Sequence, residues 1–150
     1  RQMLYIYERI INGNGREEDI QLLKDLSLVM KEASLCALGT TAPNIVLTTL
    51  EHFREEYEAH IYYGMCPAMV CKPLITYVID LEKCSGCGRC VKACPVNAIV
   101  GEPKKPHYIN QEICIKCGTC VEVCPDKYMA IEKRSGIKEK QKITKDISMI

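Results

Sequence analysis

Cysteine is the residue type through which this sequence could do chemistry. The chain of 150 residues contains 11 cysteines, and eight of them lie between residues 84 and 124. They form two copies of the pattern C-x2-C-x2-C-x3-C-P, which recurs with a period of 30 residues. The copies consist of Cys84, Cys87, Cys90, Cys94 and Pro95, and of Cys114, Cys117, Cys120, Cys124 and Pro125. Thiols at this density bind metal, take part in redox reactions or form disulfides.

Two observations disfavour a disulfide framework. The odd number of cysteines, 11, would leave one thiol without a partner. The first eleven residues carry charges at Glu8 and Arg9 and lead to no small-residue cleavage site, so we see no secretory signal. We therefore expect a reducing, cytoplasmic location, where clustered cysteines usually bind metal or do redox chemistry.

The spacing of the repeat is that of bacterial ferredoxins with two [4Fe–4S] clusters. Three cysteines with gaps of two residues can bind one face of a cluster from a single loop, whereas the fourth lies too far along the following helix and ligates the other cluster. The expected ligands are Cys84, Cys87, Cys90 and Cys124 for the first cluster, and Cys114, Cys117, Cys120 and Cys94 for the second. Two zinc sites are the alternative, although zinc modules generally pair two C-x2-C knuckles without a third cysteine and a trailing C-P.

Clusters of this kind favour electron transfer over substrate catalysis. With four cysteine ligands a cluster has no open coordination site, and two clusters in one small domain form a relay for single electrons. A structural or assembly module, whose clusters hold the domain together without turnover, is the rival hypothesis. Cations near the motifs would raise the cluster potentials or dock an acidic partner, or would serve solubility alone. They are Arg89, Lys92, Lys104, Lys105 and Lys116.

The elements that must position the cysteines follow from the same repeat. Each half is expected to have a short strand, a cysteine loop, a turn or two of helix and a second short strand. The strands are expected near residues 77–80 and 98–100, and near residues 107–110 and 130–132. The segment between Cys124 and Ala130 is two residues longer than its counterpart, which leaves open the turn beside the second cluster. Residues 74–132 are therefore predicted to form a pseudo-two-fold ferredoxin-type domain.

Residues 1–64 have the apolar periodicity of helices. One helix is expected to stop at the Asn-Gly-Asn-Gly turn of residues 12–15, and a second to span residues 17–32. Asn44 can cap a third helix that ends near Gly64. The predicted core stripes are Leu22, Leu26, Val29 and Ala33, and Val46, Leu50, Phe53, Tyr57 and Ile61. The fold class is thus α+β, a small all-α bundle followed by the ferredoxin-type domain.

Two segments lie outside these domains. The connector of residues 65–73 contains Cys66 and Cys71, and with His60 and His107 these two thiols could bind a structural zinc ion. The alternative is a pair of free or buried thiols. Residues 133–150 form a Lys-rich tail that we expect to be solvated or flexible, with docking to a partner as the alternative.

The helical part resembles a known family in the segment Ser-Leu-Cys-Ala-Leu-Gly-Thr-Thr-Ala-Pro-Asn, residues 34–44. It is similar to the C-terminal cluster-binding segment of the NADH-oxidising flavoprotein subunit of respiratory complex I. It resembles more closely the beta subunit of electron-bifurcating, NAD-linked [FeFe] hydrogenases and related formate dehydrogenases, in which a two-cluster ferredoxin domain follows the flavoprotein. The resemblance covers residues 1–132 and includes residues 55–61, 66–71 and 101–107, while Ile45 stands where the family often has Pro.

This resemblance implies a further role for Cys36. In the family it would be the fourth ligand of a further [4Fe–4S] cluster, whereas spacing alone favours an ordinary buried thiol. The other three ligands and the Gly-rich flavin and dinucleotide regions are not in this chain, which begins with Arg and reads as a C-terminal piece of a longer, FMN-containing subunit. It therefore has no complete catalytic site. The implied role is to pass electrons between the flavoprotein core and other subunits of a hydrogenase or formate dehydrogenase complex, or soluble ferredoxin.

Composition excludes several other classes. Apolar residues make up 47% of the chain and charged residues 26%, which is typical of a globular protein. The 20 Lys and Arg are balanced by 19 Asp and Glu, so nothing favours binding to nucleic acid or to an acidic membrane surface. The longest apolar runs are far too short to span a bilayer.

Overall fold

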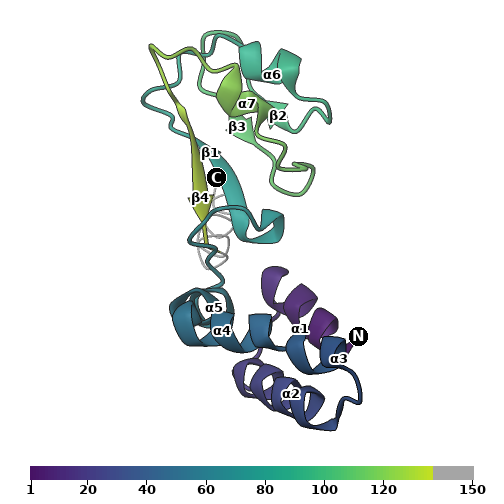
Figure 1. The fold of residues 1–150 in the computed structure, drawn as a ribbon. Coiled ribbons are helices and arrows are strands. Elements are labelled where there is room, and N and C mark those ends of the chain that lie inside the picture. The colour runs from purple at the N-terminus through teal and green to yellow at the C-terminus, as the bar shows by residue number, and fades with distance from the viewer. Residues whose placement is uncertain (137–150) are drawn as a thin grey trace. The chain divides into compact units, whose positions relative to one another are not determined.

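The computed structural model describes residues 1–136, which form two compact units (Figure 1). One unit holds residues 1–74 and the other residues 75–135. The helices of the first unit and the short strands and helices of the second confirm the α+β class. Most of the predicted basic tail falls on residues 137–150, which lie outside the described residues.

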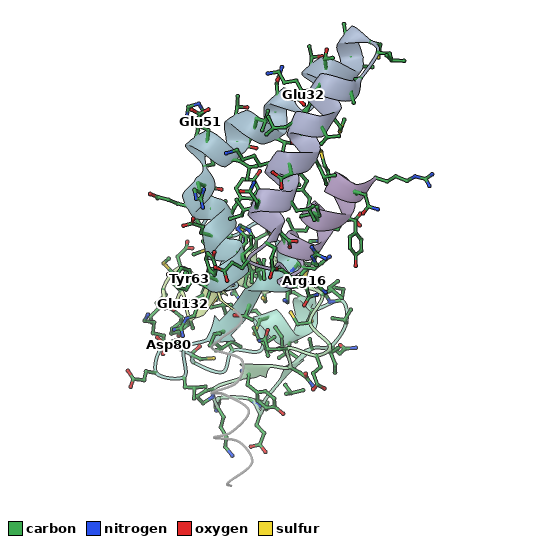
Figure 2. The ribbon with its side chains drawn as sticks, turned by 90° about the horizontal axis from the view of Figure 1, so that it is seen from below. Arg16, Glu32, Glu51, Tyr63, Asp80 and Glu132 are labelled. Carbon is green, nitrogen blue, oxygen red and sulfur yellow. The ribbon has the colours of Figure 1, made fainter. Side chains whose placement is uncertain are left out.

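Helices make up the first unit. They are α1 (Gln2–Ile11), α2 (Asp19–Ala33), α3 (Ala37–Thr41), α4 (Asn44–His52) and α5 (Arg54–Tyr62), followed by the 3-10 turn η1 (Lys72–Leu74). The core packs Ile6 and Ile10 of α1, Ile20 and Leu23 of α2, and Val46 and Leu50 of α4. Charged side chains such as Glu32 and Glu51 lie on the exposed faces of α2 and α4 (Figure 2). As predicted, α1 ends at the Asn-Gly-Asn-Gly turn.

The buried face of α2 differs from the predicted stripe. Leu22 and Val29 are 43% and 60% exposed, whereas the buried residues include Leu23, Asp19 and Ser27. Two of these are polar, and each is satisfied: Asp19 pairs with Arg9 of α1, and the Ser27 hydroxyl donates to the Leu23 carbonyl at 2.7 Å. Leu26 of the predicted stripe does pack against the core. Because a hydrophobicity pattern counts Asp19 and Ser27 as surface residues, it displaced the rest of the stripe from the buried face.

The third predicted helix is two helices. The chain breaks at Phe53, whose φ of −123° and ψ of 29° are not helical and whose side chain is 55% exposed, so Phe53 is not a core residue. Asn44 is the first residue of α4, so the N-cap position belongs to Pro43 and not, as predicted, to Asn44. The Thr49 hydroxyl bonds back to the Ile45 carbonyl at 2.9 Å, an arrangement that bends helices. The break lets Tyr57 of α5 reach Thr49, with 2.9 Å between the two hydroxyl oxygens.

The second unit is built from two small antiparallel sheets. Its elements are β1 (Ile75–Ile79), α6 (Arg89–Ala93), β2 (Ile99–Val100), β3 (Tyr108–Ile109), α7 (Thr119–Glu122) and β4 (Ile131–Ser135). Strand β1 pairs with β4 and β2 pairs with β3, so each sheet joins one strand from each half of the repeat. The core between them includes Tyr77, Ile79, Ile99, Ile109 and Ile131, together with Cys90 and Cys120.

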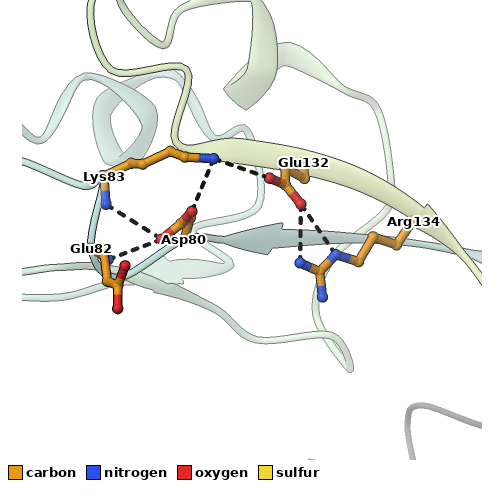
Figure 3. Close-up of polar contacts among 5 residues, drawn as sticks. All are labelled: Asp80, Glu82, Lys83, Glu132 and Arg134. Atoms are coloured by element: carbon orange, nitrogen blue, oxygen red, sulfur yellow. Dashed lines mark hydrogen bonds and ion pairs between the residues drawn. The ribbon is translucent and has the colours of Figure 1, made fainter.

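Strand β4 extends beyond the end predicted for this domain. Residues 133–135 belong to the strand, with Ser135 opposite Ile75, and not to the tail that was expected to begin there. Backbone pairing with β1 makes these residues part of the strand, although their charged side chains remain at the surface. Glu132 accepts from Arg134 at 3.0 Å and from Lys83 at 3.4 Å, and Lys83 also pairs with Asp80 at 3.1 Å (Figure 3).

Candidate metal centres

Backbone hydrogen bonds hold both cysteine loops in the same way. The N–H of Asp80 donates to the Ala130 carbonyl at 2.7 Å, and the N–H of Asn110 donates to the Ala98 carbonyl at 2.7 Å. The next bonds enter the loops, from the N–H of Cys84 to Asp80 at 3.0 Å and from the N–H of Cys114 to Asn110 at 3.1 Å. Each loop therefore starts from a position that the partner half fixes.

A left-handed glycine closes each loop and begins a helix. Gly88 has φ of 72° and precedes α6, and Gly118 has φ of 88° and precedes α7. Residues with a side chain are strained at such φ values, so glycine is the favoured residue at these two turns. The turn brings Cys90 and Cys120, the third cysteine of each loop, into the buried core.

The eight cysteines of the repeat line two cavities, four in each. The first is lined by Cys84, Cys87, Cys90 and Cys124, and the second by Cys114, Cys117, Cys120 and Cys94. These are the two sets of four that the motif spacing predicts. Each cavity thus takes three cysteines from one loop and the fourth from the other half.

The thiols of these cavities differ in how readily they ionise. Burial raises the pKa of Cys90, and burial together with the neighbouring Cys114 and Cys117 thiolates raises the pKa of Cys120 to about 11. The Thr119 hydroxyl, at the start of α7, lowers the pKa of Cys117. Four thiolates cannot share such a cavity without a cation, so binding a metal here must release protons.

The cavities fit an iron–sulfur group by their donors and by their walls. Four thiols are the ligand set of a [4Fe–4S] cluster. Ile79 and Ile131 give the first cavity an apolar wall, as Ile99 and Ile109 do in the second. The loop of residues 101–107 covers the first cysteine loop closely. A Cβ atom at Gly86 would lie 2.5 Å from the backbone N and O of Lys105.

The two-residue insertion lies beside the first cavity and not, as expected, beside the second set of cysteines. Its chain forms a turn in which the N–H of Tyr128 donates to the Pro125 carbonyl at 2.9 Å. Pro125 and Tyr128 line the first cavity with Cys124. The reason is that Cys124, the fourth cysteine of the second motif, lines the first cavity, so the segment that follows it also lies there.

A third group of potential ligands lies in the helical unit. The ligand atoms of His60, Cys66 and Cys71 all lie within 4.8 Å of one another. His60 Nδ1 is 2.7 Å from the Glu56 carbonyl oxygen, to which it can only donate, and this leaves Nε2 as the acceptor 3.5 Å from Cys71 Sγ. An imidazole oriented by a backbone carbonyl in this way is typical of zinc ligands.

The two thiols of this group have opposite pKa shifts. Burial alone would raise the pKa of Cys66, but hydrogen bonds led by those from the backbone N–H groups of Cys71 and Val70 outweigh it and lower the pKa to about 7. Burial and the neighbouring Cys66 raise the pKa of Cys71 to about 11. The surroundings therefore favour the thiolate at Cys66 over the thiolate at Cys71.

His107, which the sequence placed in this zinc group, is not among its members. Its side chain is buried, 3% exposed, and lines the first cysteine cavity. Sequence reasoning missed this role, as it missed Tyr77 in the second cavity. A signal was present, because His107 and Tyr77 are 30 residues apart and so occupy equivalent positions of the repeat.

Cys36 lies apart from these groups, at the start of α3. It is exposed, contrary to the buried thiol that spacing alone favours, and so are its neighbours Leu35 (106%) and Leu38 (78%). Within residues 1–136, no helix is long and apolar enough to cross a membrane.

Comparisons with known proteins cover both units. Residues 1–60 match the NADH-ubiquinone oxidoreductase-F iron-sulfur binding region, and residues 76–125 match the 4Fe-4S dicluster domain. The chain is 47% identical over 106 residues to the NADP-reducing hydrogenase subunit HndC of Solidesulfovibrio fructosivorans, which covers 71% of this chain and 22% of that protein.

Relatives of a second kind, the F-type subunits of NADH-quinone oxidoreductase, match the helical unit. Identity to the protein of this kind from Mycobacterium tuberculosis is 47% over 62 residues, 41% of this chain and 14% of that one. The one from Streptomyces coelicolor is 40% identical over 55 residues, 37% of this chain and 12% of that one. The chain thus spans less than a quarter of the length of these relatives. It carries an NADH-ubiquinone oxidoreductase-F iron–sulfur binding region and a 4Fe-4S dicluster domain, and is homologous to the C-terminal regions of the hydrogenase protein HndC and of these NADH-quinone oxidoreductase proteins.

Proposed function

We propose that this chain is the electron-transfer segment of a multi-subunit NAD(H)-linked oxidoreductase, in an electron-bifurcating hydrogenase or a related formate dehydrogenase. It would pass single electrons between a flavoprotein core, with its FMN, and a partner subunit or soluble ferredoxin. The observation that carries the proposal is the pair of cavities, each lined by three cysteines of one loop and one of the other half. Bound [4Fe–4S] clusters supply one-electron chemistry at such sites.

The chain's residues have distinct roles in this proposal. Cys84, Cys87, Cys90 and Cys124 hold one cluster, and Cys114, Cys117, Cys120 and Cys94 hold the other. The isoleucines of the two sheets keep water from the sulfurs, and the left-handed glycines present the loops. We also propose that the halves are related by a pseudo-two-fold axis, which the matching loop hydrogen bonds support.

Cys36 is proposed as a ligand of a further [4Fe–4S] cluster whose other ligands come from outside this chain. Its exposure between Leu35 and Leu38, and the match of residues 1–60 to an iron–sulfur binding region, support this. An exposed thiol flanked by exposed apolar residues is suited to being covered by another part of a larger protein.

We further propose that His60, Cys66 and Cys71 bind zinc. They supply one imidazole and two thiolates, three of the four ligands that a structural zinc site uses. The site lies in the helical unit at the end of α5 and in the connector, which a metal would hold in one conformation.

Reduction of the parent complex by NADH tests the relay. We expect electron paramagnetic resonance of samples frozen within one turnover to show the signals of both dicluster-domain clusters, which then decay when the electron acceptor is added. Signals that remain silent during turnover, in protein that contains the clusters, would indicate the structural module instead. The control is the same complex carrying Cys117→Ser, which should lose one signal and pass electrons more slowly.

A further inference from the structure

The two cavities are built from equivalent positions of the repeat but differ in polarity. Equivalent positions are 30 residues apart up to Pro95 and Pro125, and 32 apart after the two-residue insertion in the second half. Tyr128 therefore corresponds to Val96. The first cavity is lined by Ser85, Arg89, His107 and Tyr128, where the second has Ile115, Thr119, Tyr77 and Val96. The ligands are the same in both cavities, so these residues must account for any difference between the groups that bind there.

The segment around the first cavity is also the more positively charged of the two cysteine segments. Helix α6 carries Arg89 and Lys92, and at the equivalent positions α7 has Thr119 and Glu122. Segment 80–95 contains three cations and two carboxylates, whereas segment 110–125 contains one cation, Lys116, and two carboxylates.

His107 adds to the first cavity a buried ring nitrogen that can donate a hydrogen bond when it carries the proton. Its Nδ1 atom is buried and has no hydrogen-bond partner among the described residues. The Cδ2 edge of the ring faces Gly101, where a Cβ atom would lie 2.7 Å from Cδ2, so the Nδ1 edge faces away from Gly101. Leaving such a group unpaired is costly, and a sulfur atom in the cavity is an acceptor that would remove the cost.

Tyr77 occupies the equivalent position in the second cavity but is placed differently. Its hydroxyl lies against Gly118, where a Cβ atom would come within 2.9 Å of it. Among the described residues, the first cavity therefore has a buried polar atom without a partner, Nδ1 of His107, at the position where the second cavity has Tyr77.

We propose that Arg89, Lys92 and His107 give the first cavity, that of Cys84, Cys87, Cys90 and Cys124, the higher reduction potential of the two. Reduction adds a negative charge, which nearby cations and an N–H donor to sulfur stabilise. A single electron that enters the domain therefore resides in the first cavity, and the second is reduced only by the next electron. This inference rests on the proposed function, because it requires that both cavities bind clusters.

Exchange of equivalent residues tests the inference in the full chain, loaded anaerobically with iron and sulfide. Dithionite titration followed by electron paramagnetic resonance should show that the first electron prefers one cluster at least tenfold, equivalent to about 59 mV. Arg89→Thr with Lys92→Glu should lower the higher potential, and Thr119→Arg with Glu122→Lys should raise the lower one. Because all four side chains are at the surface or only partly buried, these variants should fold.

The contribution of His107 separates from that of the surface charges by its salt dependence. His107→Tyr, which installs the residue of the equivalent position, should lower the higher potential at any ionic strength, since the donor is buried. The shift caused by the Arg89 and Lys92 exchange should shrink in high salt, because exposed charges are screened. Combining both exchanges of charge should reverse the order of the two clusters.

Equal potentials in the native chain, or charge exchanges that move both potentials alike, would overturn the inference while leaving the proposed function standing. A native chain that takes up no iron and sulfide would overturn the proposed function itself. Iron and sulfide content, measured on each sample, distinguishes the two failures.

Discussion

Individual cysteines have different surroundings although the motif makes them look equivalent. Cys90 and Cys120 are buried in the core, whereas Cys87 and Cys117 are exposed at the outer side of their loops. The exposed pair can be changed with little disturbance to packing. They are therefore the best positions at which to test the ligand sets.

Cys87→Ser and Cys117→Ser should each remove one cluster. Iron content is expected to fall from about eight to about four atoms per chain in either variant, because each cysteine serves one cluster. The far-ultraviolet circular dichroism of the helices should be unchanged, since residues 1–74 form a separate unit. Loss of all iron in both variants would show instead that the two sites assemble as one.

Asp80 fixes the entry to the first cysteine loop, and Asn110 does the same in the second. Asp80 Oδ1 accepts from the N–H of Glu82 at 3.0 Å, and Asn110 Oδ1 accepts from the N–H of Glu112 at 3.0 Å. We expect Asp80→Ala to lower the thermal midpoint and the iron content of the domain. Asp80→Asn, which copies the second half, should retain the loop and serves as the matched control. Equal loss in both variants would assign the effect to the ion pair with Lys83.

The same carboxylate gives the domain a dependence on pH. The hydrogen-bonded ion pair with Lys83 lowers the pKa of Asp80. Its contribution to stability is therefore present above the ordinary carboxyl pKa of about 3.9 and is lost as pH falls through the lowered value. Acid unfolding of Asp80→Asn should show a smaller dependence on pH in this range than that of the native chain.

At the scale of elements, local sequence sets where helices begin and end, whereas contacts between distant residues set which helix face is buried. The Asn-Gly-Asn-Gly turn and the left-handed glycines ended and began helices where local geometry requires it. The buried face of α2 includes Asp19 beside Ile20 and Leu23. The pair of Asp19 with Arg9 joins two helices, and a hydrophobicity pattern does not show it. The break at Phe53 likewise depends on where Tyr57 meets α1 and α4, since its hydroxyl lies 3.0 Å from that of Tyr7.

Substitution of two glycines in the first cysteine loop can distinguish the cost of backbone strain from the cost of a steric clash. Gly86 and Gly88 have nearly the same φ, 70° and 72°, but a Cβ atom at Gly86 would lie 2.5 Å from Lys105 backbone atoms, whereas one at Gly88 would meet nothing within 4 Å. Gly88→Ala should destabilise the domain by about 1–2 kcal/mol through strain alone. Gly86→Ala should cost more and displace the loop of residues 101–107. Denaturant unfolding measures both, and equal costs would contradict the close approach.

Over the whole molecule, the two units carry different sets of potential metal ligands. The group of His60, Cys66 and Cys71 lies in the helical unit, and the eight cysteines of the repeat lie in the unit of residues 75–135. Zinc and iron should therefore bind independently.

His60→Ala should remove zinc from the protein and leave its iron unchanged. The imidazole is one of the three proposed zinc ligands, so its loss should weaken zinc binding strongly. The cysteine cavities belong to the other unit and should keep their iron. His52→Ala, on the exposed end of α4 and outside the group, is the matched control and should retain zinc. Elemental analysis of intact protein gives both metals, and zinc that persists in His60→Ala would exclude the site.

The sequence alone predicted which four cysteines line each cavity, because cysteine spacing within a loop is a local property and the repeat places the fourth cysteine in the other half. It also determined the α+β class and the resemblance that the comparisons confirm. Only the tertiary structure decided that each sheet pairs strands from opposite halves, that α2 turns polar Asp19 and Ser27 to the core, and that His107 faces the first cavity. These features depend on contacts between residues far apart in the chain, whose energies a local pattern does not contain.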